Sequence, residues 1–223
     1  MKHIIFFSIF FLILIIPAYG QTQQNPSLTL ETIEILGTDF NTVSRDAIVV
    51  DLENPHTVSW QVTIRNDLNY ANPDGNSVIR FYDFVNPEKF IEIGMGSQPD
   101  EKFWVAVQIP DDPGYVVVHS KPEHGWKQEL TQILAYTERA GLTVNNGERI
   151  VLSNLDVGSF KIGSYSVFGM EGSTDPPAVN SGNLQLEIMS GDPAQNQIHL
   201  FPFFLAGGLG VIVAVLLVTK KRK

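Results

Sequence analysis

Two histidines and a glutamate near the middle of the chain could together bind a metal ion. His119 ends an apolar run, and Glu123 and His124 follow in a loop that contains a proline. A loop that turns back could bring both imidazoles to one ion, and imidazole and carboxylate ligands suit Cu²⁺ or Zn²⁺. The alternative is two surface histidines next to Trp126 as a core residue. The sequence therefore offers His119, Glu123 and His124 as candidate metal ligands, with no cofactor as the expectation and copper as the alternative.

Motifs for catalysis are missing from the sequence. It has no Gly-x-Ser-x-Gly nucleophile turn, no His-Glu-x-x-His helix and no glycine-rich phosphate loop. The chain also has no cysteine, which excludes disulfides, thiol catalysis and thiolate metal sites. These absences favour a binding or structural role over an enzyme.

The elements that would position these residues are short runs with a period of two. Residues 28–36 and 57–64 alternate between apolar and polar side chains, as half-buried strands do. Turn residues such as those at 72–76 separate the runs. About ten such strands predict an antiparallel, immunoglobulin-like β-sandwich. The other candidate strands are 47–52, 78–85, 90–93, 103–109, 115–119, 149–152, 163–168 and 184–188.

The segment 129–140 departs from this pattern. Leu130, Ile133 and Leu134 have the spacing of one helical face, and Gly141 stands where a helix C-cap would be. A strand remains the alternative for this segment. If it is a helix, it would pack at one end of the sandwich.

The first 20 residues have the layout of a secretory signal peptide. Lys2 precedes an apolar run of about 13 residues, and small residues follow at Ala18 and Gly20. An uncleaved anchor is the alternative, but the run is short for the ~20 residues that span a bilayer. We expect cleavage after Gly20 and export of the chain.

Residues 198–219 form an uncharged apolar block that predicts a transmembrane helix. Its 22 residues suffice to cross a hydrocarbon core of ~30 Å at ~1.5 Å per residue. The basic tail 220–223 follows, and positive charge marks the cytoplasmic side of a membrane helix. The sequence thus predicts a single-pass cell-membrane protein with an extracytoplasmic domain at 21–190, a tether at 191–197 and a cytoplasmic C-terminus.

The predicted extracytoplasmic part is acidic. Residues 21–197 hold all 24 Asp and Glu but only ten of the Lys and Arg, a net charge of −14. Such a charge repels nucleic acid. We therefore expect no nucleic-acid partner, and the predicted topology makes the membrane and other membrane or surface proteins the expected partners. The predicted function is a surface interaction or structural module, with metal binding as the alternative.

Small residues recur along the predicted membrane helix. Ala206, Gly210 and Ala214 lie four residues apart, a spacing that lets two helices approach closely. This stripe predicts packing against a partner helix or a homodimer.

Two stretches give the chain a resemblance to a known family. Residues 105–110 followed by 122–126, and Gly147-Glu148 followed by 163–168, resemble bacterial membrane-anchored, copper-binding β-sandwich domains over about a third of the chain. The resemblance implies a β-sandwich and copper binding. That family begins its mature chain with a copper-binding histidine, whereas the predicted start here is Gln21, so no ligand is carried over. Membrane-tethered immunoglobulin-like domains match equally well.

Overall fold

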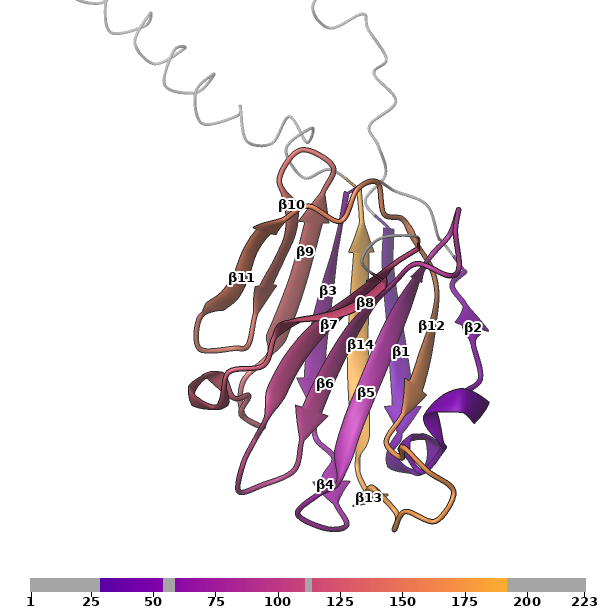
Figure 1. The fold of residues 1–223 in the computed structure, drawn as a ribbon, viewed down its shortest axis with the longest axis vertical. Coiled ribbons are helices and arrows are strands. Elements are labelled where there is room, and N and C mark those ends of the chain that lie inside the picture. Colours follow the sequence, from indigo (N-terminus) through magenta and orange to yellow (C-terminus); the bar gives the residue numbers. More distant parts are fainter. Residues whose placement is uncertain (1–28, 54–58, 111–113, 192–223) are drawn as a thin grey trace, which may run out of the picture. The chain divides into compact units, whose positions relative to one another are not determined.

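The computed structural model describes residues 29–53, 59–110 and 114–191, which fold mainly as β-strands (Figure 1). Within these ranges no helix is long and apolar enough to cross a membrane. The predicted signal peptide and membrane helix, with Ala206, Gly210 and Ala214, lie outside the described residues.

Two antiparallel sheets of six strands each face one another as the layers of a sandwich (Figure 1). The first sheet has the strand order β1 (Thr29–Leu36), β14 (Asn183–Ser190), β3 (Ser59–Asn66), β9 (Gln132–Thr137), β10 (Gly141–Asn145) and β11 (Ile150–Leu155). The second sheet has the order β2 (Val50–Asp51), β12 (Ile162–Phe168), β5 (Asn76–Asp83), β6 (Phe90–Gly96), β7 (Phe103–Ile109) and β8 (Gly114–His119).

Short elements complete the described fold. Strands β4 (Asn69–Tyr70) and β13 (Val179–Ser181) pair as a small third sheet at one end of the sandwich (Figure 1). Three short 3-10 helices, η2 (Gly37–Phe40), η3 (Ser44–Asp46) and η4 (Pro122–His124), lie in the connections.

The core lies between the sheets because alternate residues of each strand point to opposite faces. Val62 and Ile64 of β3 enter it from the first sheet, and Phe81 of β5 enters it from the second. The apolar face predicted for 57–64 is confirmed at Trp60, Val62 and Ile64, whereas Val58 lies outside the described residues. The indole of Trp60 stacks on Tyr136 and donates to the carbonyl oxygen of Phe160 at 3.1 Å.

The β-sandwich prediction is confirmed, but its immunoglobulin-like form is wrong. Immunoglobulin domains have seven or nine strands, with four in one sheet of the smaller form. Here each main sheet has six strands, and the first and last described strands, β1 and β14, are neighbours over Thr29–Leu36 and Asn183–Ser190.

The helix considered for 129–140 is wrong, and the strand alternative is confirmed. Strand β9 pairs with both β3 and β10, and its buried residues are Gln132, Leu134 and Tyr136. This is a period of two. The helical spacing arose because Ile133, on the outer face, is apolar, whereas Gln132, on the inner face, is polar.

Candidate binding site

The outer face of the second sheet carries polar and aromatic side chains. On β5, Ile79 and Phe81 belong to the core, so Arg80 and Tyr82 lie on the opposite face. The same alternation places outward-facing residues on the neighbouring strands. They are Phe90, Glu92 and Gly94 on β6, Trp104 and Ala106 on β7, Tyr115 on β8, and Ser166 and Phe168 on β12.

A buried carboxylate, Glu92, organises this outer face. One oxygen, Oε2, accepts a hydrogen bond from Arg80 Nε at 2.7 Å, and the side chain of Glu92 is only 4% exposed. The other oxygen, Oε1, accepts from Trp104 Nε1 at 3.1 Å and from the Tyr115 hydroxyl at 2.8 Å. Residues from three strands therefore converge on one carboxylate of a fourth.

The indole of Trp104 lies flat on the sheet. A Cβ atom at Gly94, its cross-strand neighbour, would come within 1.9 Å of the indole ring, so the ring occupies the space above that glycine. Ala106 is fully buried although it faces outward. Trp104 remains partly exposed and Tyr115 is 47% exposed. The result is a set of fixed aromatic rings open to solvent.

Arg80 is held between two aromatic rings. Its guanidinium carbon lies 4.8 Å from the centroid of Phe90 and 4.6 Å from that of Phe168. This cation–π contact, together with the ion pair to Glu92, restricts the side chain to one orientation. Arg80 has five N–H donors, of which the Nε group is used by Glu92.

Tyr115 is a proton donor in this network. Burial raises the pKa of its hydroxyl well above the usual value, and the hydrogen bond to Glu92 and the charge of that carboxylate raise it further. The hydroxyl is therefore protonated at physiological pH. It donates its hydrogen to Glu92 and fixes the ring of Tyr115 over the sheet.

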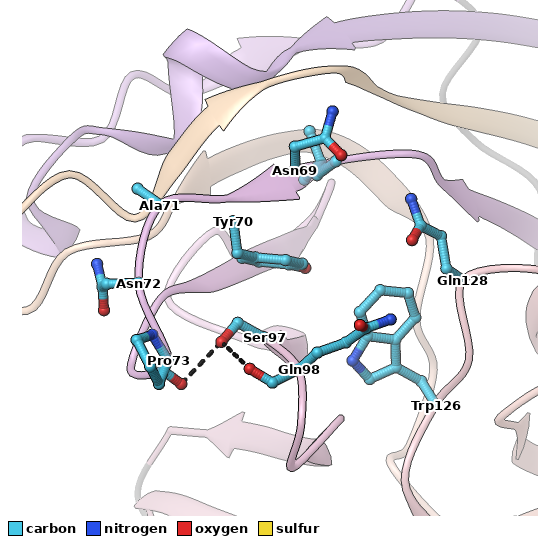
Figure 2. A pocket seen from close by; sticks show the side chains of 10 residues that line it. Asn69, Tyr70, Ala71, Asn72, Pro73, Ser97, Gln98, Trp126 and Gln128 are labelled. Carbon is cyan, nitrogen blue, oxygen red and sulfur yellow. Dashed lines mark hydrogen bonds between the residues drawn. The ribbon is translucent and has the colours of Figure 1, made fainter.

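A pocket of about 370 Å³ lies near β4 at one end of the sandwich (Figure 2). The ring of Tyr70 and the side chains of Gln98, Trp126 and Gln128 line it together with residues 71–73. No residue that lines it carries a formal charge. The pocket therefore suits an uncharged polar ligand.

Much of the polar lining of this pocket has a structural role. The Ser97 hydroxyl donates to the carbonyl oxygens of Pro73 at 2.7 Å and Gln98 at 3.1 Å (Figure 2). The Tyr70 hydroxyl is hydrogen-bonded to Ser77 at 2.9 Å, and burial raises its pKa to about 12. Trp126 is 2% exposed and donates to the Gly96 carbonyl oxygen at 2.8 Å. These groups chiefly hold the end of the sandwich together.

The structure brings two of the three candidate metal ligands together. The ring centroids of His119 and His124 are 5.7 Å apart, and the ring planes differ by 2°. His119 is buried at the end of β8, whereas Glu123, in η4, is exposed. Within the described residues no group of three or more His, Asp or Glu side chains is placed to hold a metal ion. A metal site that also includes Glu123 stays a prediction.

Sequence reasoning missed Arg80, Glu92, Trp104 and Tyr115. A signal was present in the sequence. Arg80 and Tyr82 occupy alternate positions of one predicted strand, and Phe90 and Glu92 do so in the next. Trp104 lies in the predicted strand that follows. The pairing of strands was needed to bring them together, since Arg80 lies opposite Glu92 only in the assembled sheet.

No protein-family model matches the sequence. The curated proteins contain no match to it either. The resemblance to copper-binding domains therefore gains no support from a family match.

Solved structures show distant similarity. A β-fructofuranosidase from Schwanniomyces occidentalis, complexed with fructosyl-erythritol, has 12% identity and a TM-score of 0.44, covering 74% of this chain and 34% of that one. Sheep galectin-11, in complex with glycerol, has 10% identity and a TM-score of 0.38, with coverages of 63% and 96%. A carbohydrate-binding module from Bacillus subtilis has 7% identity and a TM-score of 0.35, with coverages of 64% and 78%. This chain spans about a third of the fructofuranosidase, and no family is assigned.

Proposed function

We propose that the chain is a non-catalytic binding module, displayed outside a membrane, whose outer sheet face binds a saccharide. The observation that supports this most is the network around Glu92, which fixes Trp104, Tyr115 and Arg80 on a face turned away from the core. A buried carboxylate is costly unless it is paired and hydrogen-bonded. Glu92 is not part of the core cluster between the sheets, so we assign it to holding a binding surface in shape.

Saccharides fit the chemistry of this surface. Their rings present apolar C–H groups that pack on flat aromatic faces, and Trp104 and Tyr115 offer such faces in fixed positions. Their hydroxyl groups need directional hydrogen-bond partners, and Arg80 has further N–H donors beside the rings. Fixed aromatic rings with a few oriented polar groups are the usual composition of a small-molecule site.

The electrostatics favour a ligand without net charge. The charges of Arg80 and Glu92 cancel within one ion pair at 2.7 Å. Residues 21–197 carry a net charge of −14, which repels polyanions such as nucleic acid. A neutral saccharide from a surface polymer or glycoprotein meets both conditions, and this keeps membrane and surface molecules as the partners.

The test is a screen of neutral and acidic oligosaccharides with the full-length chain in detergent, followed by calorimetry. For a neutral saccharide that binds, Trp104→Ala should weaken affinity at least tenfold because it removes the fixed indole face. Gln128→Ala is the matched control, because it changes the pocket of Figure 2 and leaves the sheet face intact. It should bind as the unaltered chain does.

Two results would count against the proposal. Binding that is lost in Gln128→Ala but kept in Trp104→Ala would place the ligand in the pocket instead. If no saccharide binds at millimolar concentration, the module binds another class of partner, and crosslinking at the membrane would identify it.

A further inference from the structure

Two buried imidazole nitrogens in the described chain have no hydrogen-bond partner, and they belong to adjacent histidines. They are Nε2 of His119 and Nδ1 of His124. Within the described residues one other buried side-chain atom is without a partner, Oε1 of Gln132. A buried polar atom without a partner costs about 1–3 kcal/mol. Two such atoms on neighbouring rings therefore point to a common partner that satisfies both.

The spacing of the two rings suits a shared metal ion. Bonds of about 2.0–2.1 Å from two imidazoles to one ion place their ring centroids roughly 5–6 Å apart. The centroids here are 5.7 Å apart. An ion must lie in the plane of each ring, so His124 has to turn from its present stacked, parallel position toward the ion. His124 is only half-buried, which leaves room for this movement.

His119 offers one buried ring nitrogen to a ligand. Its Nε2 atom is buried and has no hydrogen-bond partner within the described residues. An imidazole binds a metal ion through the lone pair of such a nitrogen.

The loop that carries His124 is fixed from two sides. The Asn146 side chain, which is fully buried, donates through Nδ2 to the carbonyl oxygens of His124 at 3.3 Å and Gly125 at 2.6 Å. The next residue, Trp126, is anchored by its own hydrogen bonds to Glu101 and Gly96. The second histidine is therefore presented by a rigid loop.

We propose that His119 Nε2 and His124 Nδ1 bind one Cu²⁺ or Zn²⁺ ion, with water completing the coordination. Imidazole nitrogens prefer these borderline ions, and the affinity order places Cu²⁺ above Zn²⁺. Ca²⁺ and Mg²⁺ prefer oxygen ligands and should not bind here. Glu123 is not required, since the two nitrogens alone define the site. The site is separate from the proposed saccharide surface, and neither depends on the other.

The experiment is a titration of the metal-free, full-length chain with Cu²⁺, Zn²⁺ and Ca²⁺. We expect one Cu²⁺ or Zn²⁺ per chain and no Ca²⁺. His124→Gln should weaken Zn²⁺ binding at least tenfold, whereas His56→Gln, a histidine from another segment, should leave it unchanged. Because His124 is half-buried, this variant should keep the unfolding midpoint of the metal-free chain.

A second measurement does not depend on any variant. In ¹⁵N spectra of the unaltered chain, Zn²⁺ should shift the resonances of His119 Nε2 and His124 Nδ1 and leave their other ring nitrogens nearly in place. The proposal is overturned if the unaltered chain binds neither ion at micromolar concentration, as it would if water alone joins the two rings. Equal Zn²⁺ affinity in His124→Gln, or shifts at other histidine nitrogens, would overturn it as well.

Discussion

The indole of Trp104 depends on the residue beneath it. Gly94 lies directly opposite it across the strand pair, and the ring fills the volume that a side chain at Gly94 would need. Glycine in a strand often marks such a close approach. Glu92, two residues earlier, then holds the ring edge through its hydrogen bond to Nε1 at 3.1 Å. One glycine and one carboxylate thus set the height and the orientation of the indole.

We expect Gly94→Ala to disturb both stability and the proposed binding. The new Cβ would lie 1.9 Å from the Trp104 ring, so the indole must lift and lose its bond to Glu92. Overpacking of this kind costs about 1–3 kcal/mol. Urea unfolding followed by circular dichroism measures the loss.

Gly96→Ala on the same strand is the matched control for this substitution. Its Cβ would meet the Lys102 Cβ atom at 3.2 Å, a contact that a shift of a few tenths of an ångström relieves. Its free energy of unfolding should therefore fall by much less. Equal losses in the two variants would show that Trp104 does not pack on Gly94 as described.

For single residues, the sequence can predict contacts between positions that are close together along the chain. The sequence offers His119 and His124 as a pair because only four residues separate them, and their ring centroids lie 5.7 Å apart. Glu92 was not predicted, because its partners Arg80, Trp104 and Tyr115 come from three other strands. Which residues face one another across strands depends on register, and register is set when the whole sheet forms.

At the scale of elements, the β9–β10 hairpin shows that the positive φ predicted for Gly141 is present, whereas the helix considered for 129–140 is not. In the sequence Gly141 stands where a helix C-cap would be, a position that takes a positive φ. Its φ is in fact +75°, but it begins β10 after a tight turn. The same backbone conformation serves a helix end and a hairpin. Pairing of β9 with β3 decided between them, because burial of Leu134 and Tyr136 needs a strand.

Gly141→Ala should weaken this hairpin strongly. A positive φ costs a residue with a Cβ about 1–2 kcal/mol. The new Cβ would also lie 2.4 Å from the carbonyl oxygen of Leu155 on β11, which adds an overpacking cost of about 1–3 kcal/mol. We therefore expect a total loss of roughly 2–5 kcal/mol in the free energy of unfolding.

Gly158→Ala separates these two costs. Gly158 also has a positive φ, +63°, but a Cβ there would meet only the Lys89 Nζ atom at 3.6 Å. It should lose about 1–2 kcal/mol in the same urea titration, from conformation alone. A Gly158→Ala loss as large as that of Gly141→Ala would argue against the contact with Leu155.

At the scale of the whole molecule, alternation along the sequence predicted a sandwich but not its order. The predicted strands 103–109 and 163–168 closely match β7 and β12. The pairing of β1 with β14 joins residues from opposite ends of the described chain, Thr29 with Ser190. No local pattern records such a pairing, so the number and spacing of the strands do not decide the arrangement of the sandwich.

The predicted membrane topology can be tested by where the full chain is found. Residues 198–219 carry no formal charge, so a chain that contains them should stay in the membrane fraction after an alkaline wash. A chain that ends at residue 197 should be released into the soluble fraction, because the sandwich has no need of the apolar block. Release of the full chain would contradict the anchor.

Orientation can be tested with single cysteines, because the chain has none of its own. Ser173 lies in an exposed loop of the sandwich, so Ser173→Cys in intact cells should react with a maleimide that cannot cross membranes. Lys223→Cys, beyond the predicted membrane helix, should react only after lysis. The four basic residues 220–223 favour this orientation because positive charge is retained in the cytoplasm. The opposite labelling would place the sandwich inside the cell, where a surface saccharide could not reach its outer sheet face.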